Sequence, residues 1–134
     1  MTGTAAFTFR LDTRSGVPVY RQLIDQVQAG IASGTLASGA QIPTVRQVAV
    51  DLEINPNTVL RAYRELEIRG VLDTQQGTGT FVSDRKVTQD DAERGRQLEQ
   101  LVSEFVARAG AGGFTLQELI DSLHERLPED KKRR

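Results

Sequence analysis

Two short helical segments, separated by a break of about three residues, constrain this chain more than any other feature. Thr44 and Gln47 have the spacing of a capping box, which marks the start of the first segment. Asn55 is a favoured N-cap residue for the second, and Pro56 then stands at the first helical position, where its missing N–H costs nothing. The pattern predicts a helix–turn–helix over residues 44–70.

A β-hairpin is predicted directly after these helices. The β-prone runs "VLDT" and "TFVS" lie on either side of "QQGTG". Gly77 and Gly79 can adopt the positive φ angles that a hairpin loop needs. A helix–turn–helix followed by a hairpin is the order of elements in a winged helix, so we expect a mainly α fold with a small β-hairpin.

The segment before residue 44 is predicted to complete this domain. Residues 7–11, "FTFRL", alternate in polarity and are either a short strand or an ordered lead-in. Pro18 opens a helix, and Gly34 is suited to end it. Leu36 and Ile42 are expected to lie under the connection that follows. The apolar stripe of the predicted helix consists of Tyr20, Leu23, Ile24, Val27 and Ile31.

The last third of the chain carries two further helical stripes. Thr88 with Asp91 is a loose capping signal for the first helix, and Thr115 with Glu118 is a capping box for the second, which Pro128 stops. The first stripe comprises Leu98, Leu101, Val102, Phe105, Val106 and Ala109, and the second Leu116, Leu119, Ile120, Leu123 and Leu127.

Two such helices cannot enclose a hydrophobic core on their own. Their stripes must therefore cover either the winged helix of the same chain or a second chain. In the second case the predicted dimer interface consists of Leu98, Leu101, Val102, Phe105, Leu116, Leu119, Ile120 and Leu123. The expected organisation is a winged helix–turn–helix domain at 1–86, a two-helix dimerisation or effector region at 87–128 and a disordered basic tail at 129–134.

Composition excludes several classes of function. There is no cysteine, which removes disulfides and thiolate chemistry, and His124 is the single histidine, so a zinc site is not expected. No constellation for catalysis is visible, and we predict neither enzyme activity nor a cofactor. No apolar run is long enough to span a bilayer, which favours a cytoplasmic protein without a membrane partner. The net charge of −1 neither indicates nor excludes nucleic-acid binding.

The helix that begins after Asn55 carries polar side chains on its outer side. On a helical wheel with Val59 at 0°, the core positions lie between about 300° and 40°, whereas Asn57, Arg61 and Arg64 lie at about 140–200°. Side chains of this kind near a helix N-terminus are those that a recognition helix presents to the major groove. The alternative is a solvated face in which the two arginines pair with Glu65 and Glu67. Leu60 and Ile68 do not fit a purely polar face and are expected to pack against the wing or a neighbour.

These segments resemble the winged helix–turn–helix domain of GntR-family bacterial transcription regulators. The resemblance rests on residues 41–82, "QIPTVRQVAVDLEINPNTVLRAYRELEIRGVLDTQQGTGTFV". It extends back over "GVPVYRQLIDQVQAGIASGTLASGAQIP", the first helix and the loop after it. The Asn-Pro-Asn-Thr motif and the short C-terminal region are similar to the YtrA-type subfamily. Many family members have Ser-Arg-Thr-Thr at residues 55–58 and an arginine in place of Leu60, so base preference does not carry over from them.

The resemblance implies roles for particular positions. The position of Arg46 contacts phosphate or base in the family, unless this arginine only pairs with Asp51, and Gln76 and Gly77 correspond to the wing that reaches the minor groove. The complete set of predicted DNA-binding residues is Thr44, Arg46, Asn55, Asn57, Thr58, Arg61, Arg64, Gln76, Gly77 and Thr78.

The resemblance also implies a homodimer that binds an inverted-repeat operator in double-stranded DNA, as a repressor, with control of an ABC-transporter operon as a further implication. The small-molecule effector, if the protein has one, is unknown. The alternative is a winged-helix adaptor that binds another protein and no DNA. An RNA-binding module is disfavoured because the chain lacks an aromatic stacking platform.

Overall fold

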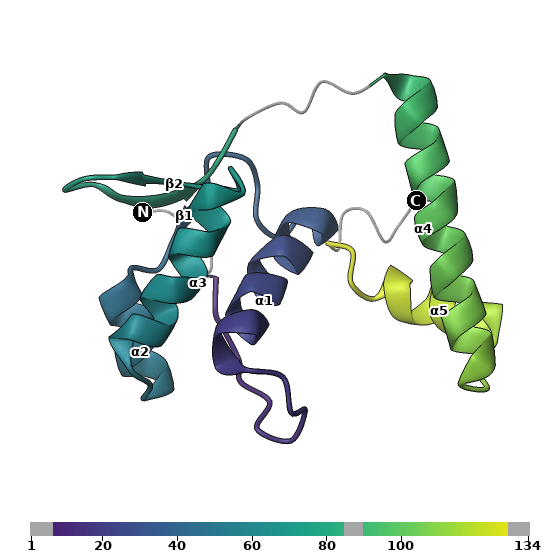
Figure 1. The fold of residues 1–134 in the computed structure, drawn as a ribbon, viewed down its shortest axis with the longest axis horizontal. Coiled ribbons are helices and arrows are strands. Elements are labelled where there is room, and N and C mark those ends of the chain that lie inside the picture. The colour runs from purple at the N-terminus through teal and green to yellow at the C-terminus, as the bar shows by residue number, and fades with distance from the viewer. Residues whose placement is uncertain (1–6, 85–89, 129–134) are drawn as a thin grey trace. The chain divides into compact units, whose positions relative to one another are not determined.

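The computed structural model describes residues 7–84 and 90–128. The chain divides into two compact units, residues 1–85 and 86–134. The first unit contains three helices and three strands within its described residues: α1 (Val19–Ser33), β1 (Gln41–Ile42), α2 (Val45–Leu52), α3 (Pro56–Ile68), β2 (Leu72–Gln75) and β3 (Gly79–Val82). The second contains α4 (Asp91–Ala111) and α5 (Leu116–His124). Figure 1 shows these elements along the chain.

The helices of the first unit pack around one hydrophobic core. Helix α3 contacts α1, α2 and strand β2. The predicted core face of α3 is confirmed, since its inward side chains are almost fully buried. The buried apolar residues are Phe9, Leu23, Ile24, Val27, Leu36, Ile42, Val48, Ala49, Val59, Ala62, Tyr63, Leu66, Leu72 and Val82.

The wing is a three-stranded antiparallel sheet in the order β1-β3-β2. The hairpin aligns Leu72 with Val82 and Gln75 with Gly79, so the predicted hairpin is confirmed. The sequence pattern missed β1, in which Ile42 pairs with Thr80. A strand of two residues has no alternation to detect, and its partner lies far away in the chain.

The segment 7–11 forms no strand and is the ordered lead-in. Side chains of α1 satisfy its backbone: Gln26 Oε1 accepts the Arg10 N–H at 2.9 Å, and Gln26 Nε2 donates to the Arg10 carbonyl at 2.6 Å. Phe9 is buried and meets Phe7 edge to face, with ring centroids 4.9 Å apart.

One member of the predicted α1 stripe was wrong. Ile31 is exposed, and Gly30 takes the buried position beside it. A Cβ atom at residue 30 would lie 3.0 Å from Phe7 Cε1 and 3.1 Å from Leu36 Cδ1. The lead-in and the loop after α1 therefore approach the helix at its glycine.

The second unit is a helical hairpin whose side chains remain largely exposed. The N-cap of α4 is Asp90, whose Oδ1 accepts the Ala92 N–H at 3.2 Å, and Thr88 lies outside the described residues. At α5 the capping box of Thr115 and Glu118 is complete, as predicted. Helix α5 ends at His124, before the predicted stop at Pro128. None of the described residues in 90–128 is buried. The predicted tail at 129–134 lies outside the described residues.

No helix among residues 7–84 and 90–128 is both long and apolar enough to cross a membrane.

Candidate nucleic-acid interface

The start of α3 is fixed by its own sequence. Asn55 has an extended backbone, and its Oδ1 accepts the Asn57 N–H at 2.8 Å. Glu53, with φ at +55°, makes the sharp turn that separates α2 from α3. The N-cap bond satisfies one of the backbone N–H groups that the first turn of a helix leaves without a partner. Pro56, at the first helical position, has no N–H and therefore needs no partner. The residues at this N-terminus, Asn55, Pro56 and Asn57, are all exposed.

The outer side of α3 is polar and open. We call Asn57, Arg61 and Arg64 the α3 face; all three side chains are exposed, and Thr58 beside them is half-buried. On the opposite side of the helix, Val59 and Leu66 are completely buried. The structure therefore leaves the amide and both guanidinium groups on the surface of the domain.

Ion pairing does not account for the arginines of the α3 face. Glu65 Oε2 accepts a hydrogen bond from Arg69 Nε at 3.0 Å, one turn further along the helix. Within the described residues neither Arg61 nor Arg64 forms a salt bridge. Arg61 instead lies over an aromatic ring of α1: its guanidinium carbon is 3.7 Å from the centroid of the Tyr20 ring. Sequence reasoning assigned Tyr20 to the core and missed this contact, which is between residues of two separate helices.

The start of α2 adds a further exposed cation. Thr44 is the N-cap, and its Oγ1 accepts the Gln47 N–H at 3.1 Å. Arg46 follows in the first turn and is exposed; it forms no salt bridge with Asp51 or any other described residue. The Asp51 alternative therefore has no support in the structure.

The tip of the wing is a three-residue loop. Gln76, Gly77 and Thr78 are all exposed, and the Thr78 N–H donates to the Gln75 carbonyl at 2.9 Å. Gly77 has φ at +80°, a conformation that L side chains rarely adopt. Gln41 Nε2 donates to the Thr78 carbonyl at 3.2 Å, so the missed strand β1 also holds the loop.

Two apolar residues interrupt the outer side of α3. Ile68 is 81% exposed and Leu60 is half-buried. Together with the α3 face and Glu65 they line a shallow depression on the helix surface. Ile68 therefore does not pack against the wing, which was one of the two predicted alternatives.

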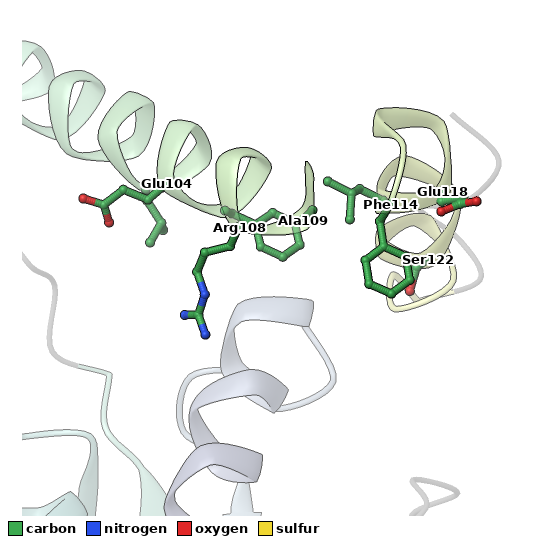
Figure 2. Close-up of a pocket in the computed structure, with 9 residues that line it drawn as sticks. Glu104, Arg108, Ala109, Phe114, Glu118 and Ser122 are labelled. Carbon is green, nitrogen blue, oxygen red and sulfur yellow. The ribbon is translucent and has the colours of Figure 1, made fainter. Parts of the chain in front are cut away.

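The second unit has an apolar surface of its own. The set predicted for dimerisation, which we call the C-terminal apolar face, has one half-buried member, Leu119. Its other seven members are exposed: Leu98, Leu101, Val102, Phe105, Leu116, Ile120 and Leu123. Part of it forms an open groove between α4 and α5. Figure 2 shows Phe114 and Ala109 at this groove, with Glu104, Arg108, Glu118 and Ser122 around it.

The fold and the polar residues on α2, α3 and the wing define a winged helix–turn–helix protein. The family model for bacterial regulatory proteins of the gntR family matches residues 19–82. The HTH-type transcriptional repressor YtrA of Bacillus subtilis is 31% identical over 116 residues, which cover 87% of this chain and 89% of the repressor. This chain belongs to the GntR family of DNA-binding transcription regulators, and its resemblance to the YtrA type is confirmed.

Solved structures agree with this assignment. A transcriptional antiterminator from Listeria monocytogenes EGD-e aligns with a TM-score of 0.64 at 26% identity, covering 90% of each chain. YtrA from Sulfolobus acidocaldarius, a GntR-family transcription factor, aligns with a TM-score of 0.53 at 27% identity, covering 87% of this chain and 94% of that one. The predicted fold class is confirmed, and the similar proteins are named as regulators rather than enzymes.

Proposed function

We propose that this protein is a homodimeric repressor that binds an inverted-repeat operator through α3 and the wing. The observation that carries the proposal is the α3 face, where Asn57, Arg61 and Arg64 are exposed and free of ion pairs within the described residues. The proposed DNA-binding surface is the predicted set: Thr44, Arg46, Asn55, Asn57, Thr58, Arg61, Arg64, Gln76, Gly77 and Thr78.

The chemistry of these side chains suits a duplex. Arginine donates in a planar fork to guanine O6 and N7, and asparagine pairs with adenine N6 and N7. The N–H groups at the start of α3 favour a phosphate. Arg46 precedes α3 in the sequence and the wing tip follows it, and both are included in the proposed surface. A protein–protein adaptor, the alternative function, has no need for groove-reading side chains around one helix N-terminus.

Dimerisation is supported by the C-terminal apolar face. Exposed leucine, isoleucine and phenylalanine side chains are unfavourable in water. Burying them contributes roughly 25 cal/mol of favourable free energy for each Å² of apolar surface removed from water. The α4–α5 hairpin has no buried residue to stabilise it alone. A second copy presenting the same face would bury both, and two recognition helices about one turn of DNA apart would read a longer site.

The resemblance to the YtrA type supports two finer proposals. The repressor role is proposed because the relative from Bacillus subtilis is a transcriptional repressor. Control of an ABC-transporter operon is proposed from the resemblance to the YtrA type alone. Such a protein acts in the cytoplasm, where bacterial DNA lies. The domain limits 1–86 and 87–128 are proposed as the DNA-binding and dimerisation parts.

Selection from a pool of random DNA duplexes tests the function. The 134-residue chain should enrich one inverted repeat. Fluorescence anisotropy should then show that Arg61→Ala binds this repeat more weakly by about 1–3 kcal/mol. An exposed arginine outside the proposed surface, Arg94, provides the matched control Arg94→Ala. If no sequence is enriched, or if Arg61→Ala binds the selected duplex as the unmodified protein does, the proposal is wrong.

A further inference from the structure

The contact between Arg61 and Tyr20 has a geometry that bears on recognition. The guanidinium carbon lies 3.7 Å above the ring centroid, which is the arrangement of a cation–π stack. Tyr20 belongs to the first turn of α1, and Arg61 belongs to the middle of α3. The stack therefore joins one side chain of the α3 face to an element outside the helix–turn–helix.

The ring is a fixed platform. Tyr20 is half-buried and packs against the hydrophobic core, as does its neighbour Val19. Close packing against the core restricts the rotamers that such a side chain can adopt. The Arg61 side chain, which would otherwise sample many rotamers at the surface, is thus aligned by a ring that cannot move freely.

Stacking leaves the donors of Arg61 available. A guanidinium group carries five N–H donors in its plane, whereas the stack uses the face of that plane. Arg61 is exposed, and no hydrogen bond or salt bridge to another described residue uses those donors. Arg64, on the same face, has no ring beneath it within residues 7–84 and 90–128.

We propose that Tyr20 is a positioning residue for DNA recognition, which stacks on Arg61 and presents its guanidinium donors to the duplex. This inference rests on the proposed function. Ordering a free arginine on binding costs part of the binding free energy as lost rotamer entropy. With the stack already formed in the free protein, Arg61 does not incur that cost, while Arg64 does.

Two substitutions of Tyr20 test the role of the ring. Tyr20→Leu keeps apolar volume but removes the π face, and Tyr20→Phe keeps the face. We expect Tyr20→Leu to weaken binding of the selected duplex about 2- to 5-fold and Tyr20→Phe to stay within about 2-fold of the unmodified protein. Val19→Ala controls for loss of core packing and should not reproduce the effect of Tyr20→Leu at matched folded fraction.

A double-mutant cycle separates positioning from a general structural effect. In the Arg61→Ala background, Tyr20→Leu should cause no further loss, whereas in the Arg64→Ala background its full effect should persist. NMR of the free protein gives a second readout. The Arg61 side-chain protons should be shifted upfield by the ring current in the unmodified protein and in Tyr20→Phe, and not in Tyr20→Leu.

The outcomes distinguish failure of this inference from failure of the proposed function. If the unmodified protein selects no duplex, the proposed function is wrong and the inference falls with it. If it selects a duplex but Tyr20→Leu binds equally well or more tightly, the function stands and the inference is overturned. Tighter binding would mean that Tyr20 withholds Arg61 from DNA. Equal losses in all backgrounds, or an absent ring-current shift, would also overturn it.

Discussion

The hydroxyl of Tyr63 donates a hydrogen bond to the carbonyl oxygen of Pro43, which joins the middle of α3 to the residue just before the N-cap of α2. Tyr63 is almost completely buried, and its ring lies 6.5 Å from that of Phe9. One side chain thus combines core packing with a polar link between the two helices of the helix–turn–helix. That link holds the start of α2, where Arg46 is exposed, in place relative to α3.

Burial raises the pKa of Tyr63 above its usual value near 10, because desolvation disfavours the phenolate. Below pH 10 the phenol is neutral in both states, and its contribution to stability is complete. Above pH 10 the unfolded state ionises while the folded state does not, so stability should fall by about 1.4 kcal/mol per pH unit from this group. Urea unfolding of the protein between pH 8 and 11 measures this slope.

Tyr63→Phe isolates the contribution. At pH 8 the loss of the hydrogen bond to Pro43 should cost about 1 kcal/mol of unfolding free energy. Above pH 10 the difference between the two proteins should shrink, because only the unmodified one carries this titration. If the unfolding free energies of the unmodified protein and Tyr63→Phe changed with pH in parallel, the Tyr63 phenol would not titrate on unfolding.

Asn55 is expected to act both in stability and in binding. Asn55→Ala removes the N-cap bond to the Asn57 N–H and should lower the unfolding free energy by about 1 kcal/mol. Asn55→Asp is the informative variant, because aspartate caps helices as well as asparagine does, and a negative charge is favourable at a helix N-terminus. It should retain stability yet weaken DNA binding through repulsion of phosphate. Urea denaturation and anisotropy measure the two effects; unchanged binding by Asn55→Asp would place residue 55 away from the duplex.

Arg46 is predicted to contact a phosphate. In that case Arg46→Ala should weaken binding to specific and non-specific duplexes alike and reduce the slope of log K against log salt by about 0.9. Arg94 lies in the first turn of α4, outside the proposed DNA-binding surface. Arg94→Ala changes the net charge by the same amount as Arg46→Ala and should leave the salt slope nearly unchanged. Anisotropy titrations over a series of salt concentrations provide the comparison, and equal slopes for all three proteins would remove Arg46 from the interface.

The C-terminal apolar face is predicted to hold the dimer together. Phe105→Glu would place two buried carboxylates at a two-fold interface, which costs several kcal/mol, and should convert the dimer to a monomer. Ala107 lies on the other side of α4 and is exposed, so Ala107→Glu adds the same charge as a control. Sedimentation velocity reports the mass. A monomeric unmodified protein, or a Phe105→Glu variant that stays dimeric, would contradict this interface.

Local features of the sequence were sufficient to place most elements. The N-cap at Asn55, the proline after it and the left-handed glycine at 77 act within a few residues of chain, so a reader of the sequence can assign them directly. The buried side of α3 followed from helical periodicity alone, and the exposed α3 face followed as its opposite. The limits of α5 were less accurate because its apolar stripe continues past His124, while its hydrogen-bonded helix does not.

The sequence by itself determined where the helices and the hairpin form, because caps, turns and periodicity are properties of neighbouring residues. Only the tertiary structure decided which distant groups meet. It brought Gln41 to the wing loop, exposed Ile31 in favour of Gly30, and set Tyr20 beneath Arg61. These contacts depend on how α1, α3 and the sheet pack in three dimensions. The residue pattern within one segment does not specify which side chains of another segment will lie next to it.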